Sequence, residues 1–444
     1  MKKTLIAFVG LIVLVSASAF ATETRTLVMG QNSMIMVDDF NMFMYPGRVN
    51  NYPNLLLGEF SQGPNFYQTG ITWQFNDENP WVLGTFVSYY PEFGAHDYDG
   101  RDLSQFGQAF STFPNQWLYN YPWWWWYDFG YEDRAPAAVN ELSDSYPRRL
   151  HLIYGRKLGG QNFGFSAQAV KASWKAEDDS TQYVPVNTDA KQSFYQYTLG
   201  FGLTEASTGK WDLGLSFMFG GWTNENPEGE KFNEPSGYYD LMASGRYFWV
   251  RNPKVTLVPH ASFGIGKRGA QNFGDLPDTT PDDDFKVEWT STAFDLGCGM
   301  NYTPGANMLA VADLGFSYWK VKGESTGGTD IDPEFLGEHS ESYFIFPYLK
   351  LGFEGEVFNW MDVRAGGYTY LWSSSFKIES DFMVDQTYNE PSSDTYLGLG
   401  FHWGRLYLDT YMDPEIVLDG FNFISGSNDA DDLNFQVSML YEMF

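Results

Sequence analysis

The chain of 444 residues carries a formal net charge of −29, and 19% of its residues are aromatic. So much negative charge excludes a nucleic-acid partner, because binding to phosphates requires basic residues. The single cysteine, Cys298, excludes a disulfide framework within the chain, and no group of Cys and His residues has the spacing of a zinc site. We therefore expect neither a cofactor nor a bound metal.

The first 21 residues have the three zones of a secretory signal peptide. Lys2 and Lys3 precede an apolar stretch at 5–15, which leads to the small residues Ala19 and Ala21. We expect cleavage after Ala21. Because no later stretch offers the roughly 18 consecutive apolar residues of a membrane-spanning helix, the sequence predicts an exported protein without a helical anchor.

Residues 22–53 form an N-terminal segment of different character. The segment is rich in Met, contains the acidic pair Asp38-Asp39, and carries Tyr45-Pro46-Gly47 shortly before the first predicted strand. Methionine is an adaptable apolar filler, so we expect this segment to pack against other parts of the fold.

From residue 54 onward, large apolar residues alternate with small or polar ones. In the stretch 195–219 this period of two continues on both sides of a short turn at 205–209. Successive side chains of a strand point to opposite faces, so the pattern predicts a β-hairpin. Seven such hairpins are predicted, at 66–76/81–90, 149–158/163–174, 195–203/211–219, 239–250/255–267, 294–302/308–319, 343–353/360–372 and 395–403/406–412, with single strands at 55–60 and 433–444.

Short turns alternate with long connections along the chain. The long connections are acidic and contain Gly and Pro, at 91–148, 175–192, 221–237, 268–284, 322–341, 374–393 and 414–431. This asymmetry is typical of bacterial outer-membrane barrels, which have tight periplasmic turns and long extracellular loops. We therefore predict an all-β fold, a closed antiparallel transmembrane β-barrel over residues 54–444, with sixteen strands, or fourteen if the opening strand at 55–60 does not span.

A barrel of this kind explains both faces of the strands. The apolar face contacts lipid, and a closed sheet satisfies every backbone hydrogen bond without water. The opposite face carries ionisable residues that a soluble core would not hold, so we predict a lumen lined by Asp212, Asp240, Arg246, His260, Asp295, Asp313, Lys350, Arg364, His402 and Asp409. The two arginines either brace the wall by pairing with inward carboxylates or set a transverse field for permeating solutes.

The first long connection contains four consecutive tryptophans, Trp123, Trp124, Trp125 and Trp126. Such rings can hold an apolar or sugar ligand, or they can fold the loop onto the rim of the barrel. No nucleophile elbow, phosphate loop or cluster of metal ligands is present, so we expect no enzymatic activity.

The two ends of the predicted barrel resemble known outer-membrane proteins. The C-terminal stretch LNFQVSMLYEMF resembles the signal by which the barrel-assembly machinery recognises its clients, and this resemblance implies that machinery as a partner. The segment at 26–60, with its glycine, its acidic pair and its Tyr-Pro-Gly turn, resembles the start of the long-chain fatty-acid transporter family and its secretion-system relatives. That resemblance implies a segment folded into the lumen as a plug, although simple packing of the N-terminus inside the wall is the alternative.

These features together predict a channel or transporter in the bacterial outer membrane, passing small or hydrophobic solutes through a polar lumen. The alternative is a surface-binding or secretion-partner barrel that recognises a ligand or protein with its aromatic loop. We expect outer-membrane lipid and lipopolysaccharide as neighbours. The acidic loops are either solvated or bridged by divalent cations to that lipopolysaccharide.

Overall fold

The computed structural model describes most of the chain in thirteen stretches. They are residues 23–61, 66–76, 80–89, 148–175, 191–207, 209–225, 231–233, 239–272, 286–305, 307–326, 337–379, 384–412 and 435–443. The predicted signal peptide at 1–21 and the tryptophan run at 123–126 lie outside these residues.

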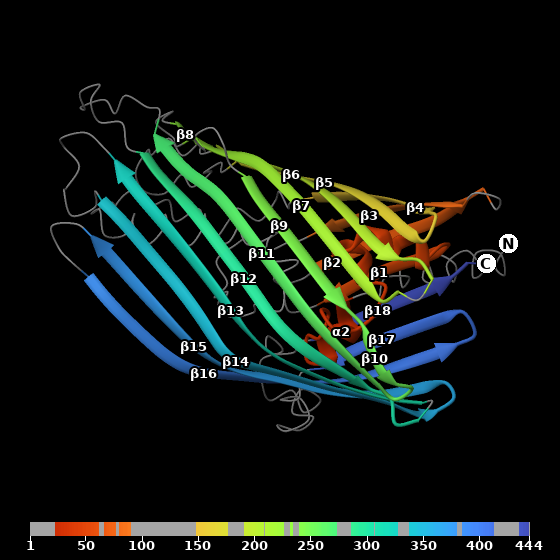
Figure 1. The fold of residues 1–444 in the computed structure, drawn as a ribbon. Coiled ribbons are helices and arrows are strands. Elements are labelled where there is room, and N and C mark those ends of the chain that lie inside the picture. The colour runs from red at the N-terminus through yellow and green to blue at the C-terminus, as the bar shows by residue number, and fades with distance from the viewer. Residues whose placement is uncertain are drawn as a thin grey trace, which may run out of the picture.

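The described strands form one closed antiparallel barrel (Figure 1). Strand β1 pairs with β2 on one side and with β18 on the other, so the sheet has no free edge. The strands are β1 Leu55–Ser61, β2 Phe66–Phe75, β3 Trp81–Tyr89, β4 Arg148–Leu158, β5 Gln161–Lys175, β6 Lys191–Glu205, β7 Trp211–Glu225, β8 Lys231–Asn233, β9 Tyr239–Tyr247, β10 Trp249–Asn252, β11 Val255–Asn272, β12 Lys286–Tyr302, β13 Met308–Thr326, β14 Gly337–Phe358, β15 Met361–Glu379, β16 Val384–Trp403, β17 Leu406–Met412 and β18 Phe435–Glu442.

The barrel wall has sixteen strands in the described part of the chain. Only Phe248 separates β9 from β10, and both pair with β11, so they form one wall strand. The short β8 is an extra strand between β7 and β11, beyond the end of β9. The prediction of a closed antiparallel barrel with sixteen strands is therefore confirmed, and the alternative of fourteen is wrong because 55–60 pairs along its length on both sides.

The predicted turns at one end of the barrel are tight. Gly159-Gly160 joins β4 to β5 and Gly404-Arg405 joins β16 to β17, each as a two-residue connection. Gly159 and Gly404 have φ angles of +60° and +69°, which glycine adopts without strain and which match the twist of a hairpin.

Several strands continue well past the predicted boundaries at the other end. The stretch 374–393 was predicted as a loop, but most of it belongs to β15 and β16. Strand β14 likewise begins at Gly337, inside the predicted loop 322–341. The sequence pattern missed these extensions because their outward residues are polar or charged, so the apolar alternation that marks a lipid-facing strand stops before the strand does.

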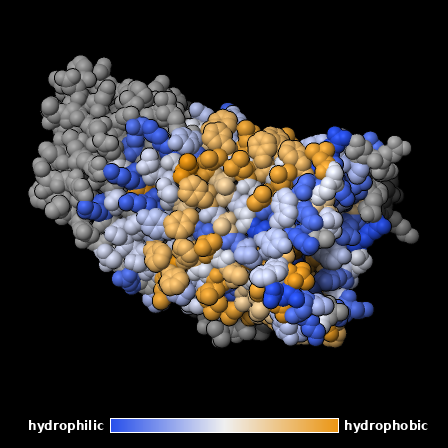
Figure 2. Space-filling model, viewed as in Figure 1, coloured by the Kyte–Doolittle hydropathy of each residue, from blue (hydrophilic) through white to orange (hydrophobic). Residues whose placement is uncertain are grey.

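An apolar belt surrounds the outside of the barrel next to the tight turns. On β13 the outward residues of 308–318 are all hydrophobic and include Leu314, which is 55% exposed. A strand of about 9–11 residues crosses the hydrocarbon at a tilt, so this stretch has the length of one crossing. In the view of Figure 2, hydrophobic residues gather across the middle of the visible outer surface of the barrel.

Residues 23–54, called the lumenal segment from here on, lie inside the barrel near the end with the tight turns (Figure 1). They form the helices α2 Glu23–Val28 and α3 Asn41–Met44 and the 3-10 helix η1 Pro46–Asn51. No helix within the described residues has the length and hydropathy required to cross a membrane.

Candidate functional site

The lumenal segment is almost completely enclosed by the wall. Met29, Ile35, Met42 and Val49 each have no exposed surface. They belong to two hydrophobic clusters that join the segment to inward residues of the wall, one around Phe86 and Ile153 and one around Phe248, Val258 and Val311. The methionines therefore fill irregular space against the barrel interior.

Inward glycines of the wall allow this close approach. A Cβ atom on Gly164 would lie 2.0 Å from the backbone of Pro46, and one on Gly366 would lie 2.3 Å from the carbonyl oxygen of Val28. Real Cβ atoms do not come so close to other atoms, so any larger residue at either position would displace the segment.

A buried arginine pair anchors the segment to β7. The Arg48 guanidinium donates two hydrogen bonds to the Asp212 carboxylate, with Nε–Oδ1 and Nη2–Oδ2 distances of 2.7 and 2.8 Å. Arg246 Nε on β9 donates to the same carboxylate at 2.7 Å. The Asp212 side chain is fully buried, and the Arg48 and Arg246 side chains are 4% and 0% exposed, so this is one desolvated network of two cations and one anion.

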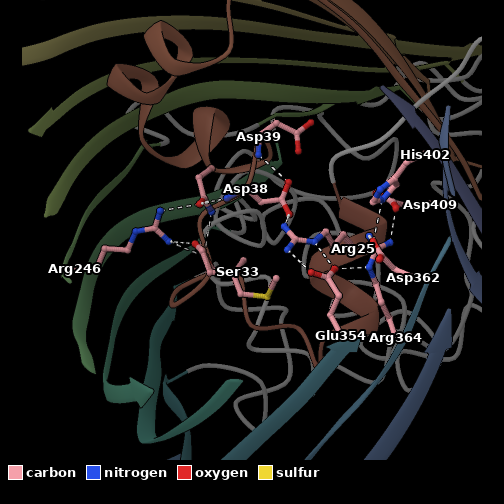
Figure 3. Close-up of polar contacts among 12 residues, drawn as sticks. Arg25, Ser33, Asp38, Asp39, Arg246, Glu354, Asp362, Arg364, His402 and Asp409 are labelled. Atoms are coloured by element: carbon pink, nitrogen blue, oxygen red, sulfur yellow. Dashed lines mark hydrogen bonds and ion pairs between the residues drawn. The ribbon is translucent and has the colours of Figure 1, made fainter. Parts of the chain in front are cut away.

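Arg246 also binds the backbone of the lumenal segment. Its Nη1 donates to the carbonyl oxygens of Ser33 and Met36 at 2.9 and 2.7 Å, and its Nη2 donates to Asn41 Oδ1 at 2.7 Å (Figure 3). The guanidinium carbon lies 4.7 Å from the centre of the Tyr45 ring. Arg246 must share the Asp212 carboxylate with Arg48, so one anion faces two cations. The additional backbone and amide acceptors supply the hydrogen bonds that Arg246 needs in this buried position.

A second ion network joins α2 to strands β14, β15 and β17 of the wall. Arg25 donates to Asp38 within the segment at 2.6 Å and to both carboxylate oxygens of Glu354 on β14, at 2.8 and 2.9 Å (Figure 3). Glu354 also accepts from Arg364 Nε on β15 at 2.5 Å. Arg364 in turn pairs with Asp409 on β17. Positive and negative side chains therefore alternate from Arg25 in the segment through Glu354 and Arg364 to Asp409 in the wall.

The two adjacent carboxyl groups of the segment differ in their ionisation. Burial alone would raise the pKa of Asp38, but the Arg25 cation and hydrogen bonds more than offset this and lower it. Burial raises the pKa of Asp39 well above its usual value, and the neighbouring Asp38 charge raises it further, with Asp409 contributing. Burial opposes the charge of Arg25, yet Asp38 and Glu354 keep its pKa well above the usual value. These surroundings therefore favour the ionised form of Asp38 and the neutral form of Asp39.

A third polar contact holds the start of α2. Glu59 on β1 is 1% exposed and accepts hydrogen bonds from Thr24 N and Thr24 Oγ1 at 3.1 and 2.9 Å. Gln436 on β18 donates to the same Glu59 oxygen. The segment is thus bound at the seam where the first and last strands close the barrel.

The remaining predicted lumen residues also face inward. His260 Nε2 lies 3.0 Å from both oxygens of Asp313, and its Nδ1 lies 3.4 Å from Asp295. Lys350 Nζ lies 3.4 Å from the carbonyl oxygen of Gln31 in the lumenal segment. His402, at the turn end of β16, pairs with Asp362 at 2.9 Å.

A cavity of about 90 Å³ adjoins the lumenal segment. Phe40, Phe43, Met44 and Pro46 of the segment form one side of it, and inward residues of β2–β7 and β9, among them Asp240, form the rest. On β7 the cavity is lined by Ser216 and Met218, which lie farther from the tight turns than Asp212. The cavity therefore lies on the side of the segment that faces the long strand ends, and its lining combines aromatic and Met side chains with hydroxyls and amides.

Eight of the ten predicted residues fall into three groups. Asp212 and Arg246 meet in one network, and Arg364, Asp409 and His402 meet around Asp362 in another. His260, Asp295 and Asp313 form a cluster of their own. Asp240 lines the cavity, and Lys350 approaches the lumenal segment.

Sequence reasoning missed several charged partners. Glu354 and Asp362 share the inward parity of Lys350 and Arg364, so the same pattern would have included them. Arg25 and Arg48 were missed because the lumenal segment has no periodicity. Basic residues within a Met-rich apolar segment were the available signal.

No group of three or more metal-ligating side chains with the geometry of a metal site occurs among the residues that the structure describes. The proposed ligand-binding tryptophans, 123–126, lie outside those residues.

The known proteins that resemble this chain do so at very low sequence identity. No protein-family model matches the chain, and no curated protein matches it. The solved structures similar to it include the ferric yersiniabactin uptake receptor FyuA from Yersinia pestis, at 8% identity over 88% of this chain and 80% of that one, with a TM-score of 0.34. The toluene transporter TodX from Pseudomonas putida is 9% identical over 95% of this chain and 97% of that one, with a TM-score of 0.35. The translocator domain of the autotransporter NalP from Neisseria meningitidis is 10% identical over 70% and 93%, with a TM-score of 0.30.

The location of the protein follows from its own fold. A closed antiparallel barrel with an apolar belt and a charged interior satisfies its backbone without water and presents hydrocarbon-compatible side chains to lipid. The chain is a bacterial outer-membrane barrel.

Proposed function

We propose that the protein is an outer-membrane transporter whose lumen is closed by the lumenal segment and opens when that segment leaves the wall. The observation that carries this proposal is the network of Arg48, Arg246 and Asp212, buried between the segment and the wall. A barrel of sixteen strands is too wide for wall side chains to fill, so an aqueous passage remains when nothing else occupies it.

The character of the interface supports a segment that detaches. Ion pairs from Arg25 and Arg48 and two hydrogen bonds from Thr24 hold the segment, alongside two hydrophobic clusters. Water can solvate each of these charged groups once the segment moves, whereas a purely apolar interface would have no such alternative partner. Relative motion is the usual behaviour of interfaces of this polarity.

The cavity beside the segment suggests which solutes enter. It lies on the side that faces away from the periplasmic turns, and its lining mixes Phe43, Phe86 and Met242 with Ser166 and Gln168. We infer that the transporter accepts small solutes with an apolar part, which would contact the segment first.

Liposome swelling tests this function. Liposomes that contain the protein are diluted into neutral solutes of increasing size, and the wild type is compared with Asp212→Asn, which weakens the anchor of the segment. We expect faster swelling for the variant, with an upper size limit, and wild-type rates for Glu205→Gln at the β6–β7 turn. Swelling of the Asp212→Asn liposomes no faster than that of protein-free liposomes would contradict transport through the lumen.

A further inference from the structure

The cavity beside the lumenal segment has a floor made by three neighbouring wall strands, β5, β6 and β7. Inward residues in register line it there in two rows. Gln168 on β5 pairs with Thr198 on β6. Two residues nearer the tight turns, Ser166 on β5 pairs with Gly200 on β6, and Gly200 pairs with Ser216 on β7. We call Ser166, Gln168, Thr198 and Ser216 the polar floor, because their side chains form hydrogen bonds and carry no charge.

The polar floor has the dimensions of one six-membered ring with its substituents. Adjacent strands lie about 4.8 Å apart, and residues two apart on one strand about 7 Å, so the floor spans about 10 by 7 Å. Gly200 lies among its members and has no side chain to cover the strand. A Cβ there would lie 2.3 Å from Ser166 Oγ, so the glycine leaves room for that hydroxyl and for a solute above it.

The groups of the polar floor both donate and accept hydrogen bonds. Ser and Thr hydroxyls and the Gln amide each have this double capacity, whereas an ionised side chain has only one of the two. Thr198 Oγ1 is buried and has no hydrogen-bond partner in the part of the chain that the structure describes. A buried hydroxyl without a partner is destabilising. A solute hydroxyl beside Thr198 would supply the missing hydrogen bond.

The charged residues that line the cavity lie on β4 and β9, on either side of the polar floor. Arg149 Nε donates to the amide oxygen of Gln168 at 2.7 Å, in the orientation of the amide that satisfies both groups. The Asp240 carboxylate leans from β9 toward β11, where a Cβ on Gly266 would lie 1.7 Å from Asp240 Oδ1. Arg149 and Asp240 both have further interactions. A charged solute group would therefore have to compete with these partners.

The lumenal segment supplies an aromatic ring to the same cavity. The centre of the Phe43 ring lies 4.8 Å from that of Phe86 and 5.3 Å from that of His151, so wall residues of β3 and β4 hold it in place. Phe43 nevertheless remains partly exposed and lines the cavity. The face of an aromatic ring is negative and attracts the C–H groups that stack on it. The cavity thus combines uncharged hydrogen-bonding groups of the wall with an aromatic ring of the segment.

We propose that the cavity binds one sugar unit, with the sugar hydroxyls on the polar floor and the C–H face of the sugar ring against Phe43; this inference rests on the proposed function, because the sugar would be the transported solute. A purely apolar ring would leave the hydroxyls of the floor without partners, and a carboxylate would engage only Arg149. The cavity of about 90 Å³ holds about six to nine water molecules. This volume suits a single sugar unit and excludes a longer chain.

The test measures solute binding by saturation-transfer NMR on the full-length barrel, in a detergent that has no sugar head group. The probes are methyl β-glucoside, benzoate and benzene, which represent a sugar, an anion on a ring and an apolar ring. The double variant Thr198→Val/Ser216→Ala removes two hydroxyls of the floor with little change of shape. Its matched control, Thr292→Val/Ser342→Ala, removes the same groups from the outer face of the barrel. Heat-modifiable gel migration verifies that each barrel is folded.

We expect the wild type and the control to bind the glucoside more tightly than benzoate or benzene. The double variant should bind the glucoside about tenfold more weakly, because each lost hydrogen bond lowers the affinity about threefold. A second variant, Phe43→Leu, should weaken glucoside binding about threefold, since it keeps an apolar side chain but removes the aromatic face. Tighter binding of benzoate or benzene by the wild type, or unchanged glucoside binding by the folded double variant, would overturn the proposal.

Transport of the glucoside is measured separately, so that the sugar site and the transport function can fail independently. Liposomes that contain Asp212→Asn are diluted into the glucoside, and their swelling reports its passage. Glucoside binding by the wild type without swelling of these liposomes would support the site and contradict the transporter. Swelling without glucoside binding by the wild type would support the transporter and overturn the site.

Discussion

The exchange of Asp212 for Asn tests the anchor of the lumenal segment most directly. Asp212 accepts two hydrogen bonds from Arg48 and one from Arg246, and all three side chains are buried. An Asn side chain keeps nearly the same shape but removes the only carboxylate that either arginine contacts in the described residues. Arg246 keeps its backbone acceptors, whereas Arg48 keeps only the carbonyl oxygen of Gly209 at 3.2 Å and a share of the one neutral amide oxygen of the new Asn.

The magnitude follows from the buried charge that remains. Removal of one partner from a buried ion pair costs about 3–5 kcal/mol, because the other charge stays desolvated without compensation. In Asp212→Asn this cost destabilises the docked state, in which Arg48 is buried. Release of the segment removes the cost because water then solvates Arg48. The population of the released state should therefore rise between about a hundredfold and a few thousandfold.

Hydrogen exchange measured by mass spectrometry on the reconstituted barrel checks this prediction. Peptides from 24–52 should lose protection in Asp212→Asn while peptides from β11–β16 keep theirs, and Glu205→Gln should match the wild type. A second variant, Arg48→Met, should loosen the segment less, because Asp212 then keeps Arg246 as a partner. Unchanged protection of 24–52 in Asp212→Asn would refute the anchoring role of this network.

Three further predictions concern the segment and the belt. Because the pKa of Asp39 is raised in the docked state, the contribution of Asp39 to docking should be full below the ordinary carboxyl pKa and be lost as pH rises through the raised value; over that range the conductance of planar bilayers should increase with pH in the wild type but not in Asp39→Asn. Gly164→Ala should place a Cβ 2.0 Å from the segment and destabilise docking by about 1–3 kcal/mol, measured by hydrogen exchange, whereas Gly160→Ala, with no atom within 4 Å, should have no effect. Leu314→Arg should reduce the free energy of unfolding in lipid vesicles by about 2–4 kcal/mol, whereas Thr292→Arg, beyond the belt, should change it by about 1 kcal/mol or less; equal effects would place the belt elsewhere.

The barrel itself was predictable because lipid on one side and a lumen on the other impose a strict period of two. The alternation around Leu213 and Leu215 predicts both the hairpin and the face that contacts lipid, and the confirmed strand count depends on repeating that inference along the chain. The extensions of β14–β16 were not predictable in this way. Residues such as Ser340 and Ser375 face water rather than lipid on their outer side, so no apolar pattern marks them as strand.

In the interior of the barrel, only the residues that the strands contribute could be predicted from the sequence. Parity alone places Asp212, Arg246 and Arg364 on the inner face. Their partners Arg48 and Arg25 belong to a segment of short helices whose path depends on packing against several strands at once. No local periodicity encodes such a path, which is why the ion networks became visible only in the structure.

The central claim, that the lumenal segment closes the lumen, is tested most directly by a reversible lock. A Cβ on Gly299 would lie 2.9 Å from the Cβ of Ile35, and a shift of less than about 1 Å brings the pair to disulfide geometry. We therefore expect Ile35→Cys/Gly299→Cys, in a Cys298→Ser/Asp212→Asn background, to be closed in single-channel recordings when oxidised and to open after addition of dithiothreitol. Equal conductance before and after reduction, with disulfide formation verified by mass spectrometry, would contradict the claim.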